Sequence, residues 1–244
     1  MLRIPSEPSV IGIMVLSFLA GILIGGFSMD YFLGLSLIAF TIHLLTFSHI
    51  QDIFRARGFR YLPLPLTLNT IPYILGMALG RQSILLPMVI GGGVFTTYSI
   101  LVYRHGYRYY PAILVGTLLI TTQFLVAKGF NSIDGIILVE DVLIWIYLAG
   151  YYTSTAYYVE SRLVFRDVPP INPFILWIAS STPIVIYIYS LIPSYIEPTV
   201  KHLANIFRNV KYSGAREIRR MGWIEMVRSL IFTILLITGY RLIG

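Results

Sequence analysis

The residues of this chain that could do chemistry are ionisable side chains within or beside long apolar stretches. Such groups are costly at membrane depth and usually face a helix-bundle interior or a water-filled cavity, where they bind ions, protons or substrates. Eleven residues hold such positions: His43, His49, Asp52, Glu140, Asp141, Glu160, Asp167, Glu197, Lys201, Glu225 and Arg228. Their spacing matches no catalytic motif, so the catalytic residues of any enzyme activity stay unassigned.

Two adjacent acids, Glu140 and Asp141, lie near the start of an apolar stretch. Adjacent side chains point about 100° apart on a helix, so the two carboxylates need not share a site. In one interpretation they form a proton or cation site inside the membrane. In the other, the helix begins near Val142 and both acids lie at its positive N-terminal end. The sequence favours the second interpretation.

Two further acid–base spacings suit helical ion pairs. Glu197 and Lys201 are four residues apart, a separation at which Glu and Lys pair on one helix face. If their helix crosses the membrane, this is a buried pair and a pathway element; if the helix lies at the surface, the pair is solvated. Glu225 and Arg228, three apart, read as a pair at the membrane interface.

Polar groups deep in the apolar stretches predict hydrogen bonds between helices. His43 is expected to be hydrogen-bonded inside a bundle, and Asn69 and Gln123 are expected to bond across helices. His49 and Asp52 could share a ligand, but two side chains do not make a metal site. The chain has no cysteine, which excludes disulfides and thiolate metal sites. We therefore predict no metal and no cofactor.

The elements that must position these residues follow from the composition. Of the 244 residues, 57% are hydrophobic and 12% are charged, and the mean hydropathy is +0.78. Soluble domains carry about 25% charged residues. These values exclude a disordered chain, a collagen-like chain and an ordinary soluble enzyme. They predict a multi-pass protein of the cell membrane that forms a single helical domain over residues 1–244.

Runs without Asp, Glu, Lys or Arg mark most of the predicted membrane spans. Sustained strand alternation is absent from the sequence, so the expected class is all-α. The eight spans, the sixth of which carries Glu140 and Asp141, are Val10–Phe27, Tyr31–Phe47, Leu62–Gly80, Ser83–Tyr103, Tyr110–Ala127, Gly135–Tyr158, Ile171–Leu191 and Trp223–Ile243.

A further helix, Ile196–Val210, decides between eight and nine spans. Its apolar residues recur every three or four positions and form one stripe, with Lys201, His202 and Asn205 on other faces. This helix could lie flat at the interface, or it could cross as a polar ninth helix shielded by its neighbours.

The distribution of cations favours the crossing. With a cytoplasmic N-terminus, eight spans leave nine Lys and Arg inside and eight outside, whereas nine spans leave thirteen inside and four outside. The positive-inside rule therefore prefers nine spans. We interpret the net charge of +7 as orientation and contact with anionic membrane lipids, and not as nucleic-acid binding.

Glycine spacing adds packing predictions. Gly21 with Gly25, and Gly76 with Gly80, show the small-xxx-small spacing that lets helices approach closely. The run Gly91–Gly93 either unwinds its helix near a substrate or permits tight packing, and we favour tight packing.

Two segments resemble the YwiC-like family of integral membrane proteins. They are Tyr147–Arg162, reading YLAGYYTSTAYYVESR, and Arg220–Leu230, reading RMGWIEMVRSL. Pro5-Ser6-Glu7 before the first span is also similar, whereas the His-Gly-Ala-Trp stretch typical of that family is absent. The resemblance implies a membrane protein and brings no established activity.

The predicted architecture also resembles the UbiA-type prenyltransferases, which have nine helices and an inward N-terminus. Their aspartate-rich motifs lie in the second and sixth loops and hold a metal-bound diphosphate. Here the second loop offers Asp52, with Ala56 four residues later, and the sixth offers Glu160 and Asp167. The resemblance therefore implies the architecture with degenerate motifs.

Two functional hypotheses follow from these features. The first is a non-enzymatic membrane protein that binds or moves a small molecule or lipid. The alternative is a membrane enzyme acting on an isoprenoid or lipid diphosphate, for which Asp52, Glu160 and Asp167 are few carboxylates to hold a metal.

Overall fold

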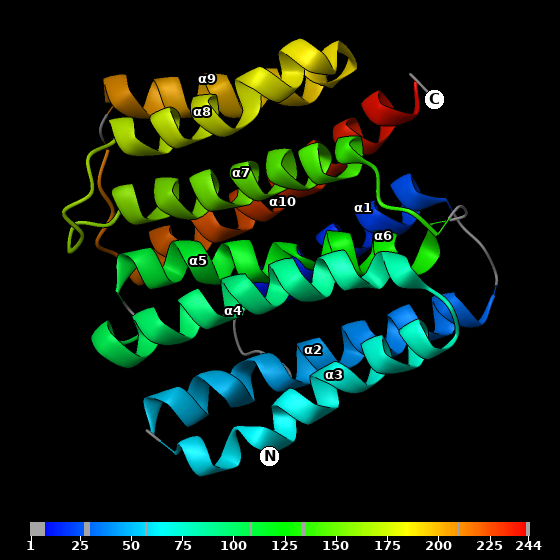
Figure 1. Cartoon of the computed structure of the whole chain (residues 1–244). Coiled ribbons are helices and arrows are strands. Elements are labelled where there is room, and N and C mark those ends of the chain that lie inside the picture. Colours follow the sequence, from blue (N-terminus) through cyan, green and yellow to red (C-terminus); the bar gives the residue numbers. More distant parts are fainter. Residues whose placement is uncertain are drawn as a thin grey trace. The chain divides into compact units, whose positions relative to one another are not determined.

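The computed structural model of the chain describes residues 8–26, 30–56, 58–107, 109–132, 135–208 and 210–242. Within these ranges the protein consists of α-helices, three short 3₁₀ turns and connecting loops, with no β-strand (Figure 1). The all-α prediction is therefore confirmed for the described part of the chain.

Over the described residues each predicted apolar run falls on a helix, although the ends differ by several residues; the predicted ends Phe27 and Ile243 lie outside the described residues. Thr122 alone separates α5 from α6, and the two form one helical rod, Tyr110–Asn131. The helices are α1 (Pro8–Gly25), α2 (Tyr31–Arg55), α3 (Pro63–Ala78), α4 (Leu85–His105), α5 (Tyr110–Thr121), α6 (Gln123–Asn131), α7 (Val139–Ser161), α8 (Ile171–Tyr187), α9 (Ile192–Arg208) and α10 (Ala215–Arg241).

Several helices are long and apolar enough to cross a membrane. Five segments of the described chain meet this criterion by length and composition: Pro8–Gly25, Tyr31–Phe54, Gln82–His105, Tyr110–Asn131 and Ala215–Arg241. The apolar helix α8 is shorter, at 17 residues. These features are those of a transmembrane protein.

Local sequence explains where helices in the first half begin and end. Asp30 caps α2, because its carboxylate accepts hydrogen bonds from the backbone N–H groups of Phe32 and Leu33 at 2.9 and 3.2 Å. Pro63 opens α3, where its missing N–H has no intrahelical partner to lose. Gly80, with φ +91°, lies just beyond the end of α3 in a conformation that favours glycine.

The chain divides into two compact units. Unit 1 comprises Met1–Val142, and unit 2 comprises Leu143–Gly244. Helix α7 begins in unit 1 and continues through unit 2. Whether the chain behaves as a single domain stays a prediction.

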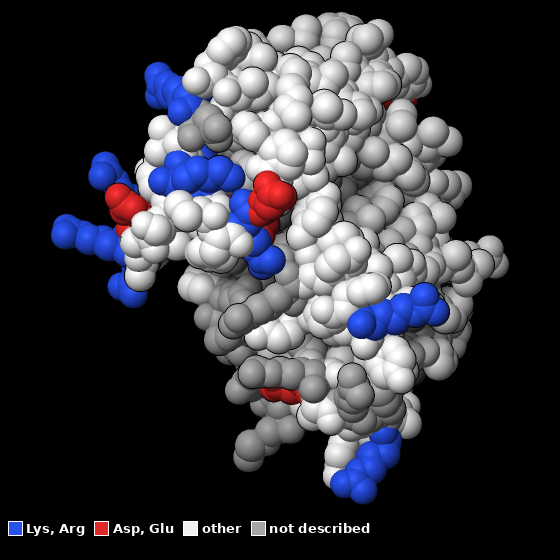
Figure 2. Space-filling model, turned by 90° about the vertical axis from the view of Figure 1, so that its left-hand side faces the viewer, with Lys and Arg blue, Asp and Glu red and all other residues white. Residues whose placement is uncertain are grey.

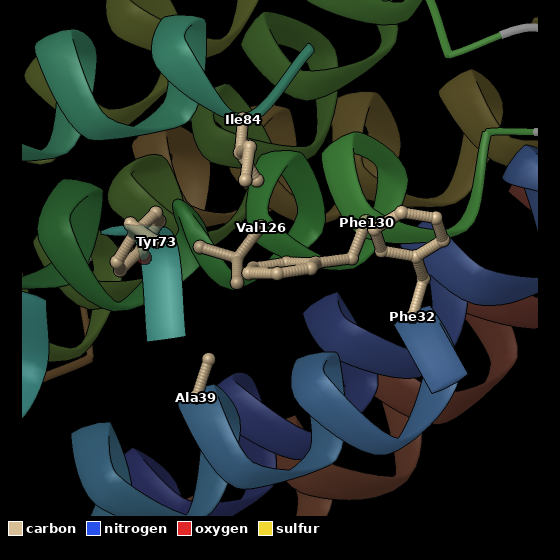
Figure 3. Close-up of a cluster of buried hydrophobic side chains, with 6 residues drawn as sticks. All are labelled: Phe32, Ala39, Tyr73, Ile84, Val126 and Phe130. Atoms are coloured by element: carbon tan, nitrogen blue, oxygen red, sulfur yellow. The ribbon is translucent and has the colours of Figure 1, made fainter. Parts of the chain in front are cut away.

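Unit 1 packs α1 against α6 and places α2 between α3 and α6. Figure 3 shows one of its apolar clusters, in which side chains of α2, α3 and α6 meet beside the turn before α4. The cluster consists of Phe32, Ala39, Tyr73, Ile84, Val126 and Phe130.

Glycines set the contact between α1 and α6. A Cβ atom on Gly21 would collide with the backbone carbonyl oxygen of Phe124, and one on Gly25 would lie 3.0 Å from the Lys128 side chain. The predicted close approach at these two glycines is confirmed. Gly76 likewise packs against Ile84 and Phe130, whereas its predicted partner Gly80 terminates the helix.

The glycine run Gly91–Gly93 does neither of the things predicted for it. Helix α4 remains continuous from Leu85 to His105, so the run does not unwind. A Cβ atom on any of the three glycines would meet nothing within 4 Å. The favoured prediction of tight packing is therefore wrong, because open space lies beside α4 at this point.

Unit 2 is built around aromatic side chains. The rings of Tyr151 (α7) and Phe232 (α10) stack at 3.7 Å between centroids with an interplanar angle of 4°. The ring centroid of Trp177 on α8 lies 5.4 Å from that of Tyr147 on α7 and 5.6 Å from that of Tyr195 on α9. These contacts join all four helices of unit 2.

Candidate functional site

Unit 1 contains a cavity of about 280 Å³. Its lining comes from α1, α2, α3, α4 and the α5–α6 rod, and is mostly aliphatic or aromatic. The residues that line it are Met14, His43, Thr46, Phe47, Ile50, Leu66, Asn69, Thr70, Tyr73, Pro87, Met88, Gly91, Gly92, Phe95, Tyr98, Leu119, Ile120, Thr122 and Gln123.

His43 anchors a polar network on the cavity wall. Its Nδ1 lies 3.1 Å from Oε1 and 2.9 Å from Nε2 of Gln123, and its Nε2 lies 3.3 Å from the Tyr73 hydroxyl. The network therefore joins α2, α3 and α6. The predicted hydrogen bonding of His43 and of Gln123 across helices is confirmed.

A second network lies one turn further along α2. The Asn69 amide donates to Thr46 Oγ1 at 2.8 Å and to the Pro65 carbonyl at 2.6 Å. Because Thr46 follows His43 by three residues, both networks face the same side of α2. The predicted interhelical role of Asn69 is confirmed, and the cavity has several hydrogen-bonding groups near one another.

Gly91 and Gly92 form part of the α4 wall of the cavity. Their missing side chains account for open space that larger residues would fill. Apolar walls with a few convergent polar groups are the usual composition of a small-molecule site. The cavity is therefore a candidate binding site.

Unit 2 contains a separate feature, a network of four charged side chains on α9 and α10. Lys201 Nζ lies 3.0 Å from Glu225 Oε2, and Glu225 Oε1 lies 2.6 Å from Nη1 of Arg228. Arg228 Nε lies in turn 3.1 Å from Glu197 Oε1. The predicted Glu225–Arg228 pair is observed, whereas Lys201 pairs across helices with Glu225 and not with Glu197.

Helix α9 has its polar face buried and its apolar face exposed. Lys201 and His202 are buried, whereas Ile196, Val200 and Phe207 have exposed fractions of 54%, 59% and 81%. This is the reverse of an amphipathic helix on a water-soluble protein. The exposed stripe matches the residues whose spacing marked this helix in the sequence.

Two polar side chains of α9 that are absent from the eleven candidates also reach α7. His202 Nε2 lies 3.2 Å from Ser154 Oγ, and the Asn205 amide donates to Ser161 Oγ at 3.1 Å. In the sequence, the position of both residues away from the apolar stripe of this helix was the feature that could have indicated their contacts. Their partners on α7 carried no signal in the sequence.

The two adjacent acids have different surroundings. Asp141 is fully buried, its Oδ1 lies 2.9 Å from Lys128 Nζ, and its Oδ2 accepts the Leu138 N–H at 2.8 Å. Glu140 is exposed. Both acids lie in the first turn of α7, which begins at Val139. The favoured prediction, that both acids lie at the N-terminal end of the helix, is therefore confirmed, although Asp141 is buried.

The remaining candidates lie near helix ends. On α2, His49 is half-buried and Asp52 is exposed; Glu160 Oε2 lies 2.6 Å from Arg166 Nε, and Asp167 is exposed. Across the described ranges, no three His, Cys, Asp or Glu side chains gather to hold a metal ion.

Comparison with protein families, curated proteins and solved structures finds no match. The resemblances to the YwiC-like family and to the UbiA-type prenyltransferases therefore stay predictions. Function must be inferred from the geometry of this chain's own residues.

Proposed function

We propose that this protein is a multi-pass protein of the cell membrane that binds or moves a small apolar molecule or lipid in the cavity of unit 1. The observation that carries the proposal is a cavity of about 280 Å³ whose apolar walls include the His43 and Asn69 networks. Ligand sites in proteins combine these same two features.

The glycines of α4 support a functional reason for the space. Glycine in a helix interior costs about 1 kcal/mol relative to alanine. No neighbour lies close enough to require glycine at 91 or 92, since a Cβ atom on either would meet nothing within 4 Å. What these residues provide is room in the cavity, as expected if a ligand occupies it.

We further propose nine spans with a cytoplasmic N-terminus. Support comes from α9, whose exposed apolar stripe needs an apolar environment and whose buried Lys201 and His202 need the bundle interior. An interfacial helix would turn its polar face to water. The 17 residues of α9 span about 26 Å at 1.5 Å per residue, close to the hydrocarbon thickness.

The cations of unit 2 support the same topology. Figure 2, which looks onto the helix ends at the left of Figure 1, shows a group of Lys and Arg side chains in its upper left part, with acidic side chains among them. In unit 2 these ends are those of α7 and α9 and the start of α10, where Arg162, Arg166, Arg208, Lys211, Arg216, Arg219 and Arg220 lie. The positive-inside rule assigns such an end to the cytoplasm.

Ligand identification tests the proposed function. The protein is purified in mild detergent, and bound small molecules are identified by mass spectrometry. Gly92→Leu fills the cavity, and Gly93→Leu is its matched control, since Gly93 is equally unobstructed on the same helix but does not line the cavity.

We expect a molecule that co-purifies with the wild type and with Gly93→Leu, and that is depleted at least about tenfold in Gly92→Leu. Equal size-exclusion profiles would show that both variants are folded. The same ligand content in both variants would contradict the proposal, as would a wild type that retains nothing beyond bulk lipid.

A further inference from the structure

The cavity lining specifies the charge of what can bind. Among the described residues that line it there is no Asp, Glu, Lys or Arg. Its histidine, His43, has both ring nitrogens within hydrogen-bonding distance of Gln123 or Tyr73. A charged ligand would enter an apolar space without a counter-charge, at a cost of several kcal/mol. The lining therefore selects an uncharged molecule.

The polar groups that remain suit an oxygen atom on that molecule. The hydroxyl groups of Thr70 and Thr122 donate to carbonyls of their own helices at 2.8 and 2.6 Å. A hydroxyl has a single hydrogen, so the oxygen lone pairs of both threonines remain as acceptors. The Gln123 amide has two N–H donors and a carbonyl oxygen, more than its contact with His43 uses. A ligand hydroxyl could both donate and accept here.

The rim of the cavity lies along the sides of two helices. Leu66 on α3 and Met88 on α4 are 36% and 38% exposed, and Gly92 is also exposed. Met14 and Ile120, at 1% and 3%, form the buried base. Since α3 packs chiefly on α2 and α4 chiefly on α5, the opening runs between α3 and α4. In a membrane, the sides of spanning helices face lipid chains and not water.

We propose that the cavity binds an uncharged amphiphile, an aliphatic chain with a hydroxyl group, and that it loads laterally from the bilayer between α3 and α4. This inference rests on the proposed function and names its ligand class. A volume of about 280 Å³ corresponds to about nine times the volume of one liquid water molecule. Such a volume has room for the hydroxyl group and the adjoining part of a chain, and a chain too long for it would extend through the opening.

A set of ten-carbon probes with different head groups tests the ligand class. Decane, 1-decanol and decyl phosphate are titrated into the protein in lipid nanodiscs, and bound probe is counted by native mass spectrometry. We expect 1-decanol to bind about tenfold more tightly than decane, because the hydroxyl group of 1-decanol adds one or two hydrogen bonds to the cavity, each with a small net gain. Decyl phosphate should bind more weakly than 1-decanol, and Gly92→Leu should abolish binding that Gly93→Leu retains.

A second pair of variants tests the hydroxyl contact. Thr70→Val keeps the side-chain shape and removes the oxygen, and it should bring the affinities for 1-decanol and decane closer together. Thr97→Val is the control, because Thr97 also bonds to its own helix, is exposed and does not line the cavity. It should leave the preference for 1-decanol unchanged.

The outcomes separate this inference from the proposed function. Decyl phosphate binding as tightly as 1-decanol would overturn the uncharged class, and equal binding of decane and 1-decanol would overturn the hydroxyl contact. In both cases, loss of binding in Gly92→Leu would still support the cavity as the site. Probe binding that Gly92→Leu does not affect would instead overturn the proposed function itself.

Discussion

At the residue scale, Lys201 shows how unit 2 holds a charge inside. Its side chain is 2% exposed, and Nζ lies 3.0 Å from both Glu225 Oε2 and Thr155 Oγ1. The rings of Tyr151 and Tyr158 lie 5.2 and 5.1 Å from Nζ, within cation–π range. The ammonium group therefore has a carboxylate, a hydroxyl and two ring faces around it.

Removing Glu225 should cost far more stability than removing Glu197. Glu225→Gln leaves the buried Lys201 without a counter-charge, and we expect a loss of about 3 kcal/mol. Glu197→Gln is the matched control, because Glu197 contacts Arg228 at the edge of the network, and its loss leaves Glu225 paired with both Lys201 and Arg228. Thermal unfolding in detergent, followed by tryptophan fluorescence, would measure both. Equal losses of stability in the two variants would show that Glu225 is not the counter-charge on which the buried Lys201 depends.

The acids of α7 give a second matched pair. Asp141→Asn removes the charge that lies 2.9 Å from the buried Lys128, and we expect a loss of about 3–5 kcal/mol. Glu140→Gln, one residue earlier and exposed, should change stability by less than about 0.5 kcal/mol. The same unfolding assay applies. A loss in Glu140→Gln as large as that in Asp141→Asn would contradict the assigned roles.

At the element scale, the α1–α6 contact depends on one glycine. Gly21→Ala places a methyl group against the Phe124 carbonyl oxygen, and backbone cannot move aside as a side chain can. We expect a loss of about 1–3 kcal/mol. Gly12→Ala, on the same helix with nothing within 4 Å, should instead stabilise by about 0.5–1 kcal/mol. Stability changes of opposite sign in the two variants, measured by thermal unfolding, would support this contact, and changes of the same sign would contradict it.

The helices themselves could be predicted from sequence because apolar runs bounded by charges are local signals. The partners of Lys201 could not. Helical spacing pointed to Glu197, four residues earlier, whereas the carboxylate 3.0 Å away belongs to Glu225 on α10. Periodicity shows which face of a helix a residue occupies but not which helix packs against that face.

The candidate site was predictable in part for the same reason. Polar residues isolated in apolar runs indicated that His43, Asn69 and Gln123 would bond between helices, and they do. The cavity beside them carried no local signal. Its space depends on how α3 and α4 pack next to Gly91 and Gly92, which is a property of tertiary packing.

At the scale of the whole molecule, the nine-span topology makes a prediction about sidedness. Ser213 lies between α9 and α10, and Gly58 lies between α2 and α3. With nine spans both loops are cytoplasmic. Because the chain has no native cysteine, Ser213→Cys and Gly58→Cys each report a single position to a membrane-impermeant maleimide. We expect both to react from the same side of sealed vesicles; labelling from opposite sides would contradict nine spans.

The ion pair between α9 and α10 also has a consequence for biogenesis. In the nine-span topology, α9 would enter the membrane carrying Glu197 and Lys201, and a Lys at the centre of a helix, as Lys201 is, costs about 2.5–3.5 kcal/mol on translocon insertion scales. The buried counter-charge of Lys201 is Glu225, which is synthesised 24 residues later. Helix α9 is therefore poorly suited to insert alone. We expect α9 to remain at the translocon until α10 has been synthesised, and the two helices to enter the bilayer together as a hairpin.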